Sequence, residues 1–179
     1  MNVRVNAAML ELLGGDPEYY ETSALTIPDS LRKQVELGFK EVEGCVVPAF
    51  FVPSSIWSEA RPRVDNIDDE TGLECLLSSV HLDGLVPDDT ALTELARLGL
   101  DFAFVLRGVL LDSQIAGPFA IIISAQEPDP ELNVGPTCTV RFHRIRVGQV
   151  WAADNLESYQ EAVAVCDFDT LPPATSAFA

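Results

Sequence analysis

The chain has 179 residues, of which 28 are aspartate or glutamate and 11 are lysine or arginine, giving a formal net charge of −17. Its length suits one domain with a sizeable core, and its 47% hydrophobic content excludes disorder throughout the chain. The negative charge disfavours nucleic acid and anionic membranes and favours basic partners. We therefore expect other protein subunits as partners, in an oligomer or larger assembly, with no specific nucleic-acid binding and no membrane contact.

The N-terminus and the cysteines indicate where the protein acts. The stretch VNAAMLELL lacks the basic cluster and cleavage site of a signal peptide, and Glu11 interrupts it. The longest uncharged apolar run, IAGPFAIIISA, is too short to cross a bilayer. We therefore expect a location in the cytoplasm or a virion. Four cysteines lie far apart in apolar segments and are expected to be reduced and mostly buried: Cys45, Cys75, Cys138 and Cys166.

The first half of the chain predicts helices. A short apolar helix at 5–13 ends at a pair of glycines. The helical spacing of apolar residues predicts a second helix near 29–42, and acids followed by Gly99 bound a third near 88–98. The run CVVPAFFV at 45–52 predicts a strand at a sheet edge or a bulge, because it contains a proline.

The second half predicts an antiparallel sheet, because short β-rich runs are separated by turn residues. The strands are expected near 101–111, 118–126, 138–150 and 162–168. Residues 72–82 and 155–165 fit either a helix or a strand. The fold class is therefore α+β, with N-terminal helices packed on a mostly antiparallel C-terminal sheet. We expect one domain over 1–179, with a helical half at about 1–99, a sheet half at about 100–170 and an extended tail at 171–179.

Positive charge is concentrated in one window, residues 132–153, which contains no acid. Strict alternation there would mix core and solvent residues on both faces of a strand, so we predict a β-bulge at His143 or Arg144. The bulge would place Phe142 and Ile145 together on the core side. The remaining side chains would form an outward row of Arg141, His143, Arg144 and Arg146.

Two interpretations of this basic row remain open. The cations could pair with acids on neighbouring strands and loops, as charged residues in sheets often do. The candidate acids are Asp112, Glu127, Asp129 and Glu131. Alternatively, the row is a contact surface for an acidic or anionic partner.

No motif in the sequence names a reaction. There is no G-x-S-x-G elbow, no paired Cys/His spacing for zinc, and no phosphate-binding loop. The acidic stretch at 65–74 does not have the register of a calcium loop. We therefore expect a protein that is not an enzyme and uses no cofactor or metal.

Two functions of different classes remain open, and an enzymatic function ranks below both. The first is a non-enzymatic structural or assembly subunit, such as a bacteriophage head–tail connector, tail terminator or tail-tube protein, whose acidic lumen lets DNA pass without binding. The second is an acidic antagonist, such as a toxin-immunity or anti-defence protein, which presents carboxylates to a basic cleft and can mimic DNA. Besides the basic row, the candidate partner-binding residues are Asp65, Asp68, Asp69 and Glu70.

Overall fold

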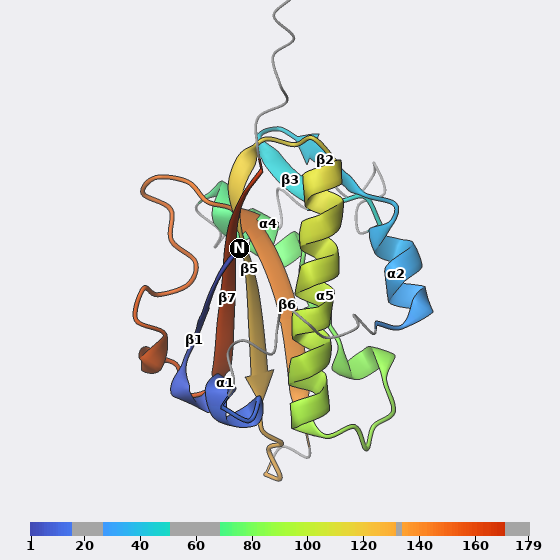
Figure 1. The fold of residues 1–179 in the computed structure, drawn as a ribbon, viewed down its shortest axis with the longest axis vertical. Coiled ribbons are helices and arrows are strands. Elements are labelled where there is room, and N and C mark those ends of the chain that lie inside the picture. Colours follow the sequence, from blue (N-terminus) through green and yellow to red (C-terminus); the bar gives the residue numbers. More distant parts are fainter. Residues whose placement is uncertain (16–26, 51–68, 132–133, 171–179) are drawn as a thin grey trace, which may run out of the picture.

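The computed structural model describes residues 1–15, 27–50, 69–131 and 134–170, which form an α+β fold around an antiparallel sheet. The sheet has five strands in the order β1-β7-β5-β6-β4. In that order they are Asn2–Val5, Ala162–Thr170, Gly117–Gln126, Thr137–Arg144 and Val80–His81. The long central strands β5, β6 and β7 therefore carry shorter strands at both edges (Figure 1).

One face of the sheet is covered by α5 (Leu92–Asp112), against which α1 (Ala7–Leu12) and α2 (Asp29–Val35) pack (Figure 1). The helix lies very close to the sheet at Gly99, where an added Cβ would be 2.7 Å from Cγ2 of Ile123. Glycine at this position therefore allows the helix and strand β5 to approach one another.

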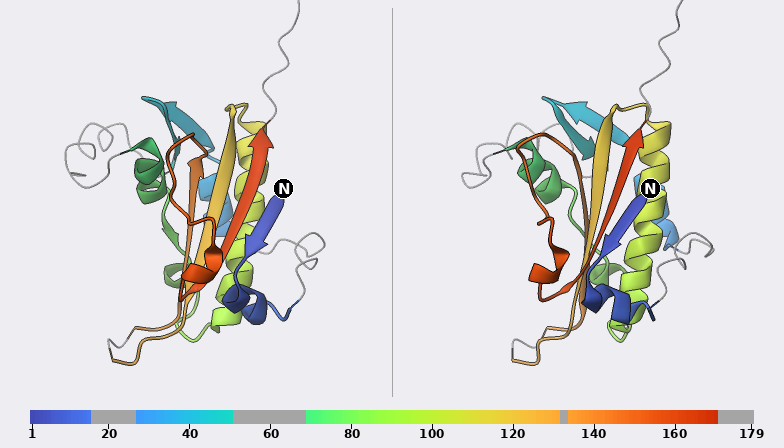
Figure 2. Two further views of the ribbon diagram at one scale, coloured as in Figure 1. Left: turned by 90° about the vertical axis from the view of Figure 1, so that its left-hand side faces the viewer. Right: turned by 60° about the vertical axis from the view of Figure 1, so that its left-hand side comes forward.

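The opposite face is covered by α4 (Glu70–Leu77) and by the segment that contains the short helix η4 (Leu156–Ser158), as Figure 2 shows. Residues of β5 and β7 that point to this face are also buried: Ala120, Ile122, Val163 and Val165. Both strands are thus covered on two sides, which explains why their sequences are continuous apolar runs without alternation.

A separate hairpin of β2 (Phe39–Val42) and β3 (Cys45–Pro48) packs against α4. All four residues of β3 are buried. The short helix η3 (Asp83–Leu85) follows β4 and precedes α5. Helices and strands therefore interleave along the chain, so the predicted order of helices first and sheet second holds only in part.

Several predicted elements are confirmed. The strands near 118–126 and 162–168 are β5 and β7, and the helix near 5–13 is α1. The strand expected at 45–52 is β3, which occupies its first four residues. Residues 72–82, which fit either state, contain the end of α4 and then β4. The edge strand β1 was not predicted, because four residues show too little alternation to recognise.

Two predicted elements are wrong. The strand near 101–111 is the C-terminal part of α5, which also contains the helix predicted near 88–98. This segment is apolar on most sides because α5 contacts the sheet and two other helices, and this hides its helical period. The helix predicted near 29–42 ends at Val35, because Gly38 adopts a φ of +79° and β2 follows.

The predicted β-bulge is also wrong. Strand β6 pairs with β5 without interruption from Thr137 to Arg144, so the strand predicted over 138–150 ends at Arg144. Phe142 is buried, as expected, but Ile145 lies beyond the end of the strand and is 38% exposed. Because the chain leaves the sheet here, the residues that follow need not share its alternation, and no bulge is required.

The four cysteines are buried free thiols, and their burial is confirmed. Desolvation raises the pKa of Cys45 to about 11 and the pKa values of Cys138 and Cys166 to about 12. Because the thiolate is the reactive form, these side chains serve as core residues at neutral pH. The predicted tail at 171–179 lies outside the described residues.

Candidate protein-binding site

The four residues of the predicted basic row do not form a row in the structure. Arg146 binds Glu74 on α4, and Arg144 pairs with Glu41 on β2 at 3.2 Å. The acids predicted as partners, at positions 112, 127, 129 and 131, are not the ones these arginines meet. The partners Glu41 and Glu74 lie on β2 and α4. Both are distant from the arginines in the sequence, so no local pattern indicates that they meet.

Arg141 and His143 lie within strand β6. Arg141 donates a long hydrogen bond to Ser124 Oγ at 3.4 Å. His143 is buried, and its Nδ1 lies 2.9 Å from the backbone oxygen of Arg144, so that nitrogen carries the proton. Burial lowers the pKa of His143, which favours the neutral imidazole. His143 is therefore a core residue beneath the chain that covers this face.

Glu74 was missed by the sequence reasoning, although it is the centre of this region. Its side chain is fully buried, and both of its oxygens bind Arg146 at 2.8 Å. The same carboxylate accepts hydrogen bonds from the backbone N–H groups of Val46 at 2.6 Å and Arg144 at 2.7 Å. Glu74 thereby joins α4, β3 and the end of β6, and we assign it a structural role.

The predicted acidic cluster lies partly outside the described residues, which do not include Asp65 and Asp68. Asp69 caps the N-terminus of α4, where its side chain accepts a hydrogen bond from Gly72 N–H at 2.7 Å. Glu70 accepts a hydrogen bond from the Gln149 side chain at 2.7 Å. The two described acids of this cluster, Asp69 and Glu70, therefore lie at the N-terminus of α4, where Glu70 meets Gln149 of the segment that follows the basic row.

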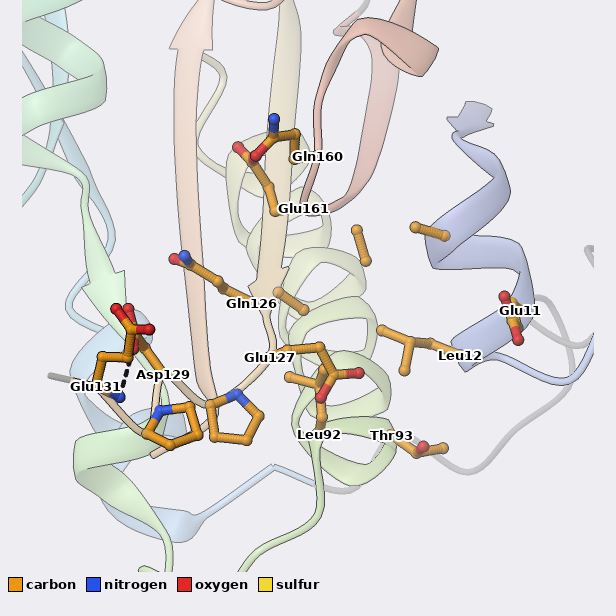
Figure 3. A pocket seen from close by; sticks show the side chains of 15 residues that line it. Glu11, Leu12, Leu92, Thr93, Gln126, Glu127, Asp129, Glu131, Gln160 and Glu161 are labelled. Atoms are coloured by element: carbon orange, nitrogen blue, oxygen red, sulfur yellow. Dashed lines mark hydrogen bonds between the residues drawn. The ribbon is translucent and has the colours of Figure 1, made fainter. Parts of the chain in front are cut away.

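An acidic cleft of about 750 Å³ lies at the end of the sheet where β5 ends and β7 begins. Its walls come from α1, the first turn of α5, the loop after β5 and the residues that lead into β7 (Figure 3). Its carboxylates are Glu11, Glu127, Asp129, Glu131 and Glu161. None of the described residues that line this cleft is a lysine or an arginine.

The acidic cleft is lined by apolar side chains as well as by these carboxylates. Ala8 and Leu12 of α1 and Leu92 of α5 are among its apolar lining residues. In the loop, Asp129 accepts a hydrogen bond from Glu131 N–H at 2.9 Å, and its backbone forms a bridge with Val134. The loop therefore has its own internal hydrogen bonds, which hold part of the acidic lining in place.

A second cleft of about 410 Å³ lies at the start of strand β6, which pairs with β5. Its lining includes Asp83 and Asp88, together with residues 134–137 that lead into β6. It also has no lysine or arginine among its described lining residues. The loop between β5 and β6 is thus flanked by two acidic clefts.

Sequence reasoning did not predict the acidic cleft. Three of its acids lie in the stretch EPDPE, which was assigned to pairing with the basic row. Glu11 and Glu161 come from opposite ends of the chain. The strand pairing of β5 with β7 and the packing of α1 on β7 bring them together, and no local pattern could reveal this.

The described residues hold no group of three or more His, Cys, Asp or Glu side chains placed to bind a metal ion. None of the described helices is long and apolar enough to cross a membrane. No curated protein and no solved structure matches the chain. The sequence profile of the uncharacterized protein PM0498 family matches residues 4–177, and the chain therefore belongs to that family.

Proposed function

We propose that the protein is a non-catalytic binding protein that holds a basic segment of another protein in the acidic cleft. The observation that carries this proposal is the composition of the cleft, which is lined by five carboxylates and by apolar side chains, while no described lining residue is basic. A lysine or arginine side chain matches both features, because its aliphatic stem packs on apolar surface while its charged head binds carboxylates.

The rest of the molecule supports the same kind of partner. A net charge of −17 attracts basic proteins over long distances and accelerates their encounter. The cleft volume of about 750 Å³ falls within the range of pockets that accommodate a ligand, so it has room for more than one side chain.

Of the functions that the sequence leaves open, the acidic antagonist shares the basic partner, although here the carboxylates receive a basic segment and do not enter a basic cleft. A protein that imitates DNA needs carboxylates on a convex surface that enters a nuclease cleft, whereas these carboxylates line a concave surface. We therefore propose an antagonist of the toxin-immunity or anti-defence kind that grips a projecting basic segment of its target. Mimicry of DNA phosphates is not part of this proposal.

The assembly subunit, for example of a bacteriophage virion, is the second candidate. The observation that favours it is the position of both acidic clefts at one end of the sheet, beside the same loop. In a ring of subunits, such an end could line a channel through which DNA passes without binding. Mass photometry of the purified chain separates the two candidates, because a closed ring supports the subunit and a monomer supports the antagonist.

Calorimetric titration with a short oligolysine peptide at low ionic strength tests the first candidate. The variant Glu127→Lys/Glu161→Lys reverses two charges in the cleft, and we expect it to weaken peptide binding at least about tenfold, or about 1.4 kcal/mol. The control Glu36→Lys/Asp112→Lys makes the same change in net charge outside the cleft. An equal loss in both variants would show that net charge, and not the cleft, attracts the peptide.

A further inference from the structure

The chain makes a tight turn after β6, which we call the apolar turn and define as residues 145–151. Arg146 and Gln149 form an antiparallel bridge across it, and Gln149 N–H lies 3.3 Å from the Arg146 oxygen. Gly148 has a φ of +81°, which a residue with a side chain would rarely adopt at this position of a turn. The bridge and the positive φ of Gly148 therefore give the apolar turn a defined backbone conformation.

The polar residues of the apolar turn point into the protein. Arg146 makes its two bonds to the buried carboxylate of Glu74. The side-chain oxygen of Gln149 accepts hydrogen bonds from Thr71 Oγ1 at 2.8 Å and Thr71 N–H at 3.2 Å, and its amide nitrogen donates to Glu70 at 2.7 Å. The turn is thus fixed to α4 by side chains from both of its arms.

The apolar residues of the same turn point outward. Val147 is fully exposed, Val150 is 73% exposed, Trp151 is 44% exposed and Ile145 is 38% exposed. A single exposed apolar residue is ordinary in a soluble protein, but four within seven residues of an anchored turn form a patch. We propose that the apolar turn is a docking element that inserts into an apolar pocket on another protein.

Two physical properties suit the apolar turn to this role. Its backbone and polar side chains are already held by α4, so little conformational entropy is lost when it binds. Tryptophan is enriched among the residues that contribute most to protein interfaces, since it buries a large area with few rotatable bonds. A flexible polar turn would have neither property.

Charge identifies the partner as a different protein with a basic rim around its pocket. Asp69 and Glu70 lie at the foot of the turn, at the N-terminus of α4. The arginines of this segment, Arg144 and Arg146, already bind Glu41 and Glu74. A second copy of the chain would bring a charge of −17 and the same carboxylates to the contact, so repulsion disfavours it.

The apolar turn is separate from the acidic cleft. Strand β6 begins at Thr137, which pairs with Gln126 beside the cleft, and ends at Arg144, directly before the turn. The two surfaces therefore lie at opposite ends of the sheet (Figure 1). Docking at the turn goes beyond the proposed function and does not depend on it.

Photo-cross-linking tests the proposal with the full chain carrying benzoylphenylalanine at position 147, expressed in the cells that make the protein. We expect an adduct with one protein, and the cross-linked peptide should lie in an apolar surface flanked by lysine or arginine. Binding of that purified protein should then weaken at least about tenfold with Val147→Ser and with Trp151→Ser. Leu37→Ser, a control at an apolar residue that is 66% exposed elsewhere, should leave it unchanged.

Several results would overturn the proposal. The absence of an adduct would mean that nothing contacts the apolar turn, and an adduct between two copies of the chain would make the occupant a second copy. Equal weakening by Leu37→Ser and Val147→Ser would show that general surface hydrophobicity causes the binding. Since the side chain of Val147 is fully exposed, Val147→Ser should fold normally, which circular dichroism can verify.

Discussion

Replacing Glu74 by glutamine tests whether this buried carboxylate holds α4, β3 and the end of β6 together. The carboxylate is fully buried and accepts four hydrogen bonds, two from Arg146 and two from backbone N–H groups. Glutamine has one acceptor oxygen in place of two, so its NH₂ group must face donors. Arg146, with a side chain only 17% exposed, would also lose the negative charge that neutralises it.

These losses set the expected magnitude. One buried N–H group without an acceptor costs about 1–3 kcal/mol, and removing one member of a buried ion pair costs about 3–5 kcal/mol in total. Because a domain of this size has a stability of about 5–15 kcal/mol, Glu74→Gln should remove about a fifth or more of it. Urea unfolding followed by circular dichroism measures this loss directly.

Two comparisons make the Glu74 experiment specific. Glu41→Gln removes the partner of Arg144 from an ion pair whose carboxylate is half exposed, and it should cost only about 0–1 kcal/mol. The double variant Glu74→Met/Arg146→Met should lose at least about 1 kcal/mol less than the sum of its single variants, because no charge is left unpaired. A loss from Glu74→Gln no larger than that from Glu41→Gln would refute this account.

Two further predictions concern packing and pH. Gly99→Ala should lower the free energy of unfolding by about 1–3 kcal/mol, because its Cβ would meet Ile123. Gly108→Ala, on the same helix but with open space around it, should raise that free energy by up to about 1 kcal/mol. Equal effects of the two variants in urea unfolding would contradict the close packing at Gly99. Burial lowers the pKa of His143 from its ordinary value of 6.5, so its contribution to stability is present above pH 6.5 and is lost as the pH falls below it. His143→Asn should therefore lose less stability than the parent between neutral and mildly acidic pH, and identical losses would contradict this sign.

The sequence predicted those elements whose residue pattern is the one expected for the structure that they adopt. Strands β5 and β7 are short β-rich runs bounded by proline, glycine or polar residues, and the structure confirms both. Helix α5 was divided into a helix and a strand because glycine at position 99 resembles a helix end. In the folded protein that glycine allows close contact with β5, so it marks the middle of the helix and not its end.

The contacts of the candidate sites could not be predicted, because they join residues distant in the chain. Glu74 binds backbone or side-chain groups 28, 70 and 72 residues away. Within the sequence LECLL, it resembles a solvent-facing acid on an amphipathic helix. The packing of both β3 and β6 against α4 brings these donors to it. The acidic cleft likewise depends on strand pairing, which sequence periodicity does not specify.

The buried acid Glu74 explains why arginines of the basic row occur in so acidic a chain. A fully buried carboxylate requires a cation and hydrogen-bond donors, and Arg146 and the N–H group of Arg144 supply them. Arg144 in turn neutralises Glu41. Arginines that serve these internal contacts do not balance the carboxylates at the other end of the sheet, where the acidic cleft keeps its negative charge. Arg146 points inward, whereas Val147 at the tip of the turn is fully exposed. The contacts of Arg146 and Gln149 with α4 therefore hold the apolar turn in place and leave the apolar side chains of the turn exposed.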